Sequence, residues 1–278
     1  MTSLDLSAAA LRGGPRAATG EKPLDRALRH LGALRSHGEG GTTPIWHSDW
    51  AWENYEPAVL ALAKEFGLTR LLEIGGGRDP GFAGSAEAAG ITLIVNDIDP
   101  AELALLPPGY ETACFDIAGD ISARDDLVEC YDLVAARMVF EHIEDVEAAW
   151  RNVYRILKPG GVGLAFFPTL YSWPFVINHL LPDALAKKIV ETLFPARKPD
   201  GDNPVFPPHY DWCYGSEKKL KRMLDPIGFS EARVLPFWGH HYLDRIPVAR
   251  EIDAAMNTLA ARLDWRLFTT YAYVVVRK

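Results

Sequence analysis

A glycine-rich segment preceded by an acid is the part of the sequence best suited to binding a ligand. In LLEIGGGRDP, Glu73 stands before Gly75, Gly76 and Gly77, at the end of an apolar run. Glycines at a strand end let the backbone approach a ligand closely because they carry no Cβ. A nucleotide-phosphate loop would need a Lys after the glycines, and none follows. A dinucleotide loop would need glycine where Pro80 stands, so that interpretation is weakened and remains an alternative.

Two aspartates follow the next two apolar runs and suit a ligand that contains a ribose and an adenine. Asp97 comes about 20 residues after the glycines, which is the spacing of the ribose-binding acid in dinucleotide folds. Asp116 can accept a hydrogen bond from an adenine amine, and Ile117 can flank the ring. S-adenosylmethionine fits these residues because it has no pyrophosphate and because its ammonium group would suit Glu73.

Three histidines are candidates for the proton transfer that a hydroxyl or phenol nucleophile requires. His142 follows the fourth apolar run beside Glu141 and is the first candidate base, although the pair would also serve to close a turn. His209 stands in FPPHYDWCYG, and His241 follows the sixth predicted strand. His209, His240 and His241 together with Asp211 match no metal-ligand spacing, so we expect no metal site.

Alternating apolar runs and amphipathic segments predict the elements that position these residues. The best predicted helix spans 145–157 and stops at KPGG, and another over 248–263 has apolar residues at helical spacing. Near-continuous apolar strands separated by helices predict an α/β fold with a mostly parallel sheet covered on both faces. The predicted strands are 71–74, 91–95, 111–115, 131–136, 162–167, 232–238 and 271–276.

Two segments lie outside this alternation. Residues 1–44 are rich in small and polar residues, and we expect a loosely held, flexible extension with a short helix near 24–34. Residues 169–214 combine prolines and aromatics, which predicts a cap or lid inserted in a domain spanning 45–278. The candidates for contact with the substrate are Trp46, Tyr171, Tyr210 and His240.

Five motifs in a fixed order resemble those of class I S-adenosylmethionine-dependent methyltransferases that act on small molecules. They are E-x-G-x-G at 73–77, D-I-D-P at 97–100, F-D-I at 115–117, E-H-I-E-D at 141–145 and R-I-L-K-P-G-G at 155–161. The resemblance covers 53–168 and implies a Rossmann-like, doubly wound, seven-stranded sheet with the last strand antiparallel. The cofactor residues it implies are Glu73, Gly75, Gly76, Gly77, Asp97, Ile98, Asp116, Ile117 and Arg137.

Charge and composition limit the partners. The formal net charge of −8 argues against nucleic acid or an anionic membrane and favours a neutral or cationic small molecule. The three cysteines lack CxxC spacing and are expected to be reduced thiols. With no apolar run of membrane-spanning length and no leader pattern, we expect a soluble cytoplasmic protein, monomeric or homodimeric.

These observations predict transfer of a methyl group from S-adenosylmethionine to a small-molecule acceptor, with S-adenosylhomocysteine as the product. The expected target is a hydroxyl oxygen of a secondary metabolite, a sugar or a lipid-like molecule. Two alternatives stay open at this point. One is an NAD(P)-dependent oxidoreductase, which Pro80 disfavours. The other is a protein of the same fold that binds S-adenosylmethionine without methylating anything.

Overall fold

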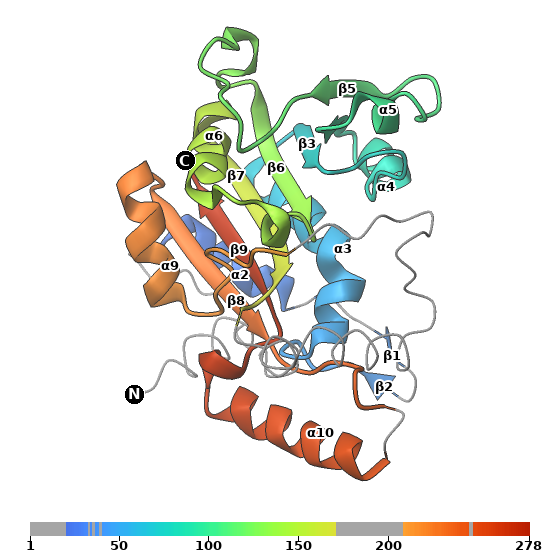
Figure 1. Ribbon diagram of the computed structural model, residues 1–278, viewed down its shortest axis with the longest axis vertical. Helices are drawn as coiled ribbons and strands as arrows, with labels where there is room; N and C mark the ends of the chain where they lie inside the picture. The colour runs from blue at the N-terminus through green and yellow to red at the C-terminus, as the bar shows by residue number, and fades with distance from the viewer. Residues whose placement is uncertain (1–20, 33, 35–36, 39–40, 171–207, 245–246) are drawn as a thin grey trace.

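A seven-stranded sheet of order β5-β4-β3-β6-β7-β9-β8 forms the centre of the protein (Figure 1). The computed structural model describes residues 21–32, 34, 37–38, 41–170, 208–244 and 247–278. The strands are β3 (Arg70–Ile74), β4 (Thr92–Asp97), β5 (Glu111–Cys114), β6 (Tyr131–Arg137), β7 (Leu157–Pro168), β8 (Glu231–Phe237) and β9 (Tyr271–Arg277).

Strand directions confirm the predicted doubly wound fold. Strands β3 to β7 pair in parallel, whereas β9 runs antiparallel to both β7 and β8. The central strands are apolar along almost their whole length, as expected for strands buried on both faces. Chain order reverses direction across the β3–β6 pair, which is the place where ligands bind in open α/β sheets.

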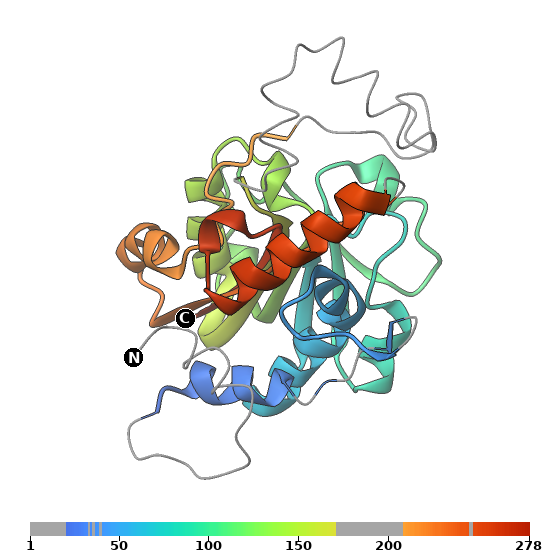
Figure 2. The same cartoon turned by 90° about the horizontal axis from the view of Figure 1, so that it is seen from below.

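Helices cover both faces of the sheet and complete two apolar cores (Figure 1; Figure 2). One core contains buried side chains of α2 (Pro23–Leu31), α3 (Ser48–Phe66) and α4 (Ala83–Ala88). The other contains buried side chains of α6 (Val146–Ile156) and α9 (Glu217–Leu224). Short helix α5 (Pro100–Leu103) follows β4, and α10 (Pro247–Arg262) connects β8 to β9. The strands β1 (His37–Gly38) and β2 (Gly41–Thr42) pair as a separate hairpin.

Helix α6 shows how closely local chemistry sets an element boundary. Asp145 caps its N-terminus, since Asp145 Oδ1 accepts a hydrogen bond from the Ala148 N–H over 2.9 Å. The helix ends at Ile156, so the prediction of 145–157 is confirmed. The following strand differs, because β7 begins at Leu157, five residues before the predicted start. Leu157 already pairs with Tyr131, and the register shifts beyond that pair where the Pro-Gly-Gly segment bulges.

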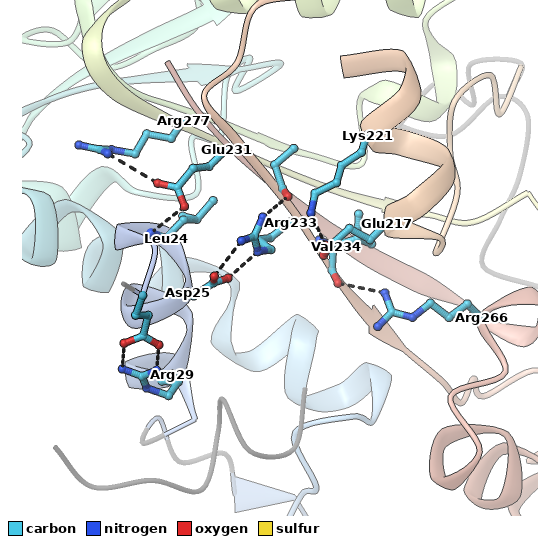
Figure 3. A network of polar contacts seen from close by, with 12 residues as sticks. Leu24, Asp25, Arg29, Glu217, Lys221, Glu231, Arg233, Val234, Arg266 and Arg277 are labelled. Atoms are coloured by element: carbon cyan, nitrogen blue, oxygen red, sulfur yellow. Dashed lines mark hydrogen bonds and ion pairs between the residues drawn. The ribbon is translucent and has the colours of Figure 1, made fainter. Parts of the chain in front are cut away.

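The short helix predicted near 24–34 is confirmed as α2, but the expectation that it is loosely held is wrong. Leu24, Leu28 and Leu31 are buried against the main core. Figure 3 shows how polar contacts fix this helix to β8: Asp25 forms a bidentate ion pair with Arg233, with N–O distances of 2.5 and 2.8 Å. The missed signal is the amphipathic pattern of PLDRALRHL, whose apolar positions recur at helical spacing.

The cap or lid predicted over 169–214 lies mostly outside the described residues, which resume at position 208. The three cysteines carry free thiols, as expected. Among the helices of the described segments, none has the length and hydropathy needed to cross a membrane.

Candidate functional site

Strand register brings three of the predicted cofactor residues to the same level at one edge of the sheet. Ile74, the last residue of β3, pairs with Asn96 on one side and with Ala136 on the other. The next residues along the three chains are Gly75, Asp97 and Arg137. Because the strands are parallel, all three stand at the carboxyl edge where the strand order reverses.

The glycine loop is packed too closely against its surroundings to accept side chains. Gly75 has φ +68°, and a Cβ there would come within 2.7 Å of Val139 Cγ2. A Cβ on Gly76 would meet Val95 Cγ1 at 2.8 Å. Gly77 also has positive φ, and its missing Cβ would lie 3.2 Å from Asp97 Oδ2. The backbone of the loop therefore runs directly beside the aspartate that ends β4.

Glu73 is buried beneath this loop and organises it. Its Oε1 accepts a hydrogen bond from the Gly81 N–H over 2.8 Å, whereas its Oε2 is buried without a partner among the described residues. Burial raises the pKa of Glu73, while the backbone N–H groups of Gly81 and Phe82 and the charge of Arg137 act in the opposite direction. A buried carboxylate oxygen without a partner favours a donor group supplied by a ligand.

The two aspartates and their neighbouring isoleucines occupy different environments. Asp97 is half-buried, and its Oδ1 accepts from the Asp99 N–H over 2.9 Å. Ile98 is 64% exposed. Asp116 is exposed and accepts from the Ala118 N–H over 2.8 Å, whereas Ile117 is buried.

Two asparagines that the sequence analysis overlooked hold the loop that carries Asp116. Asn96 Nδ2 donates to the carbonyl oxygens of Ala113 and Phe115 over 2.7 and 3.0 Å. Asn152 of α6 donates to the carbonyl oxygens of Ile117 and Gly119, both over 2.8 Å. A buried amide inside the apolar run of β4 was the available signal, because buried polar groups need partners.

Arg137 lies between the glycine loop and an aromatic helix face. Its guanidinium sits 5.7 Å from the ring centroid of Tyr55 on α3. A Cβ on Gly81 would lie 3.2 Å both from Arg137 Nη2 and from Glu73 Oε1, so the guanidinium and the carboxylate flank the same glycine. Arg78, the other charge in the loop, instead forms a bidentate pair with Glu102 over 2.7 and 2.5 Å.

The turn after β6 brings two of the predicted catalytic histidines near each other. The N–H groups of His209 and Tyr210 both donate to the backbone carbonyl of Glu141, over 2.7 and 3.1 Å. His142 follows Glu141 directly, is 31% exposed and has its Nε2 3.8 Å from Glu141 Oε1. Burial raises the pKa of Glu141 to about 7. His142 and His209 are 67 residues apart in the sequence, and the segments that carry them thus meet at the carboxyl edge.

His241 has a different environment from the one expected of a base. Its Nε2 lies 2.7 Å from Asp49 Oδ1, and its Nδ1 lies 2.7 Å from Asp244 Oδ2. The hydrogen bond to Asp49, supported by Asp244, raises the pKa of His241 to about 9, and the same pairing lowers the pKa of Asp49. His241 is thus an imidazolium at neutral pH and links α3 to the loop after β8, so the structure does not support it as a proton acceptor.

The predicted substrate-contact residues are likewise dispersed. His240 is buried, with its Nε2 3.2 Å from Asp253 Oδ1 of α10. Trp46 packs against the cluster formed by Trp238 and α10 residues. Packing accounts for both positions, whereas Tyr210 lies at the turn beside Glu141. Tyr171 lies outside the described residues. Within the described part of the chain, no three His, Cys, Asp or Glu side chains come together in a way that would hold a metal ion.

A cluster of three aromatic side chains lies at the carboxyl edge, and the sequence did not predict it as part of the site. Trp52 of α3 is 42% exposed and packs edge-on against Phe166 and Tyr271, with ring centroids 5.0 and 5.7 Å apart. Phe166 lies near the end of β7, and Tyr271 begins the antiparallel β9, so these rings meet at the same edge as the glycine loop. The closely spaced Trp46, Trp50 and Trp52 were the available signal, but the sequence does not show which of them stays exposed.

The comparisons with known proteins agree with this geometry. A family model described as a methyltransferase domain matches residues 26–231, which is more than half of the chain. The chain therefore belongs to this methyltransferase family. It is an S-adenosylmethionine-dependent methyltransferase. This assignment excludes the alternative of an NAD(P)-dependent oxidoreductase.

Several solved structures are similar in shape. An S-adenosylmethionine-dependent methyltransferase from Archaeoglobus fulgidus is 18% identical, with a TM-score of 0.46 and coverage of 83% of this chain and 99% of its own. One from Mesorhizobium loti is 18% identical, with a TM-score of 0.48 and coverage of 80% and 96%. Phosphoethanolamine N-methyltransferase 2 from Haemonchus contortus is 17% identical, with a TM-score of 0.47 and coverage of 81% and 52%. The search of curated proteins gave no significant match.

The carboxyl edge fits the cofactor of this family. Gly75 is exposed and Gly77 is half-buried, so an amino acid and a ribose can approach the backbone of the loop at these two positions. Glu73 Oε2, which is buried and has no partner in the described part of the chain, offers an acceptor, and Asp97 stands beside Gly77. When bound, S-adenosylmethionine supplies an electrophilic methyl group carried on a sulfonium.

The glycine loop should tolerate no side chain at Gly75. Gly75→Ala forces a left-handed residue, at a cost of about 1–2 kcal/mol, and sets a Cβ 2.7 Å from Val139 Cγ2. We expect a lower free energy of unfolding in urea and at least about tenfold weaker binding of S-adenosylhomocysteine by calorimetry. Gly84→Ala is the control, because nothing lies within 4 Å of its missing Cβ. Equal stability and binding in Gly75→Ala would contradict the close packing described here.

The His241 bridge should stabilise the fold in a pH-dependent manner. Because folding raises the pKa of His241 from 6.5 to about 9, its contribution is complete below pH 6.5 and disappears as the pH rises through about 9. The gap in melting temperature between wild type and His241→Gln should therefore be largest in mildly acidic buffer and vanish above pH 9. His30→Gln, which removes an exposed histidine with one carboxylate partner, is the control. A gap that grows with pH would refute the assignment.

Proposed function

We propose that this enzyme transfers the methyl group of S-adenosylmethionine to a hydroxyl oxygen of a small molecule, such as a secondary metabolite, a sugar or a lipid-like compound. The observation that carries the proposal is the convergence of the glycine loop, Asp97 and the Glu141–His142 turn at one edge of the sheet. Methyl transfer is an in-line displacement, so positioning of donor and acceptor and exclusion of water supply most of the catalysis.

In this proposal the residues of β3, β4 and β5 bind the donor. Glu73 and the backbone of Gly75 to Gly77 hold the amino-acid end, and Asp97 accepts hydrogen bonds from the ribose hydroxyls. The exposed Ile98 flanks the adenine, Asp116 accepts from its amine, and Ile117, which is buried in the core, supports this loop from below. The close approach of Gly77 to Asp97 supports this arrangement, since it places the ribose acid beside the backbone of the glycine loop. Arg137, which shares Gly81 with Glu73, is suited to the carboxylate end of the donor.

The acceptor side is expected to include Trp52 and Tyr271, whose rings meet at the carboxyl edge. Half-exposed aromatic rings give a flat apolar wall for a ring, a sugar face or an acyl chain. Tyr210 at the turn beside Glu141 is a further contact candidate. The net charge of −8 supports a neutral or cationic small molecule rather than nucleic acid or a membrane.

His142 is the proposed proton acceptor for the attacking hydroxyl. It is partly exposed, follows the exit of β6 and lies near the buried Glu141 carboxyl, which fits a base at the edge of the site. His209 is the second candidate; its Nε2 lies 3.6 Å from Glu144 Oε1. Its backbone contact with Glu141 brings it to the same turn.

Donor binding tests the proposal most simply. Asp97→Asn keeps the size and the accepting oxygen of Asp97 but removes its charge, and hydrogen bonds to charged groups contribute about 1.5–3 kcal/mol. Calorimetry should show S-adenosylhomocysteine binding about 10- to 100-fold more weakly to Asp97→Asn than to wild type, with no heat from NAD in either. Glu87→Gln, on the exposed side of α4, should bind as wild type does. Unchanged affinity in Asp97→Asn would remove Asp97 from the donor site.

A second experiment addresses His142 once labelled methyl transfer has revealed a hydroxylated acceptor. His142→Gln should lower turnover at neutral pH by about 10²–10⁴-fold, the usual contribution of a general base. Affinity for S-adenosylhomocysteine should stay unchanged, and the decline of the rate on the acid side should be lost from the pH profile. His209→Gln serves as the comparison. Near-normal turnover in His142→Gln would exclude His142 as the base.

A further inference from the structure

Helix α10 turns a polar side inward. Asp253 and Asn257 are only 6% and 4% exposed, and they are followed on the same side by the buried Ala260 and Ala261. Asn257 Nδ2 donates to Asp253 Oδ2 over 2.9 Å, and Asp253 lies against His240. The Asn257 bond lies within the helix, so the contact of Asp253 with His240 and the packing of Ala260 and Ala261 with Trp238 hold α10 to the rest of the molecule.

The outward side of α10 carries an apolar stripe, the same residues whose spacing predicts this helix from the sequence. Its members are between 47% and 73% exposed: Val248, Ile252, Met256, Leu259 and Leu263. Trp265, 47% exposed, adjoins this stripe and lines a shallow hollow together with Met256 and Leu259. Figure 2 shows α10 lying across the front of the molecule. These six residues are called the α10 apolar face below. Such inverted amphipathicity indicates that the outward side has a partner of its own.

The size of the α10 apolar face fits a protein interface. At roughly 100 Å² of exposed surface for each half-exposed large side chain, the face offers about 600 Å² per copy. Two such faces together reach about 1,200 Å², the lower bound of specific interfaces. Apolar patches on monomers are usually about 300–600 Å² at most, so this one stands at the upper end before any contribution from surrounding residues.

The spacing of the stripe is self-complementary. From Ile252 through Met256 and Leu259 to Leu263 the steps are four, three and four residues, which is the spacing of a coiled-coil seam. In an antiparallel pair around a two-fold axis, Ile252 faces Leu263 of the second copy, and Met256 faces Leu259 of the second copy. One surface patch then serves both subunits, as closed two-fold dimers require.

The charges on α10 favour a second copy over an anionic membrane. The helix carries two basic residues, Arg250 and Arg262, and two acidic residues, Glu251 and Asp253, and so is locally neutral in a chain of net charge −8. The helix itself therefore adds little repulsion between two copies. An amphipathic helix that binds anionic lipid would instead need a basic flank.

We propose that this protein forms a homodimer in which the α10 apolar faces of two copies pack antiparallel. The contact requires only the exposed residues of the α10 apolar face and the inward anchoring of the helix by Asp253, which lies against His240. It stands independently of the acceptor and base proposed above.

Sedimentation velocity on the full chain over a wide range of concentrations tests this proposal. Wild type should sediment with twice the mass of one chain. Met256→Asp/Leu259→Asp should sediment as a monomer, with dimerisation at least about a hundredfold weaker because two apolar contacts per copy are replaced by repelling charges. The matched control is Leu105→Asp, which alters a 58% exposed leucine away from α10 and should leave the dimer intact.

The double variant should keep the fold, since both side chains are about half exposed, and circular dichroism with unchanged affinity for S-adenosylhomocysteine verifies this. A wild-type chain that stays monomeric at every concentration would overturn the proposal, and this is the result expected if another part of the chain covers the face. A dimer that persists in the folded double variant would overturn it as well.

Discussion

The alignment of three parallel strands at their carboxyl ends is the constraint on which the rest of the site depends. Pairing of Ile74 with Asn96 and Ala136 fixes Gly75, Asp97 and Arg137 at one level. A shift of the register by one residue would turn each side chain to the opposite face of the sheet. The near-continuous apolar strands and the two cores that enclose them hold this register, so core packing and ligand geometry are linked through the same backbone hydrogen bonds.

Two buried glutamates mark the loops on either side of the β3–β6 pair. The side chain of Glu73, in β3, contacts the loop that follows this strand, and Glu141 lies in the turn after β6. Burial raises the pKa of both carboxyls, which makes their ionised forms costly unless partners are present. Each glutamate also anchors a loop: the Gly81 N–H donates to the Glu73 carboxylate, and the His209 and Tyr210 N–H groups donate to the Glu141 backbone carbonyl. Both loops of the site are thus held by backbone N–H donors, one at the Glu73 carboxylate and the other at the Glu141 backbone carbonyl.

The sequence predicts the sheet and the donor-side loops because both depend on local patterns. Apolar runs predicted the seven strands, and Asp145 with the Pro-Gly-Gly segment predicted the limits of α6. Residues whose roles depend on distant partners were harder to predict. The carboxylates around His241 come from α3 and from its own loop, and His240 is paired across to α10. The apolar stripe of α10 predicted the helix, but periodicity alone does not show whether a stripe faces the core or another molecule.

The measurement that tests the donor site most directly is a crystal structure of the protein with S-adenosylhomocysteine bound. The geometry predicts the ribose hydroxyls within hydrogen-bond distance of Asp97, the adenine amine beside Asp116 and the amino-acid end over Gly75 to Gly77. A ligand bound away from the carboxyl end of β3, or a ribose without contact to Asp97, would contradict the assignment of this edge of the sheet as the methyl-donor site.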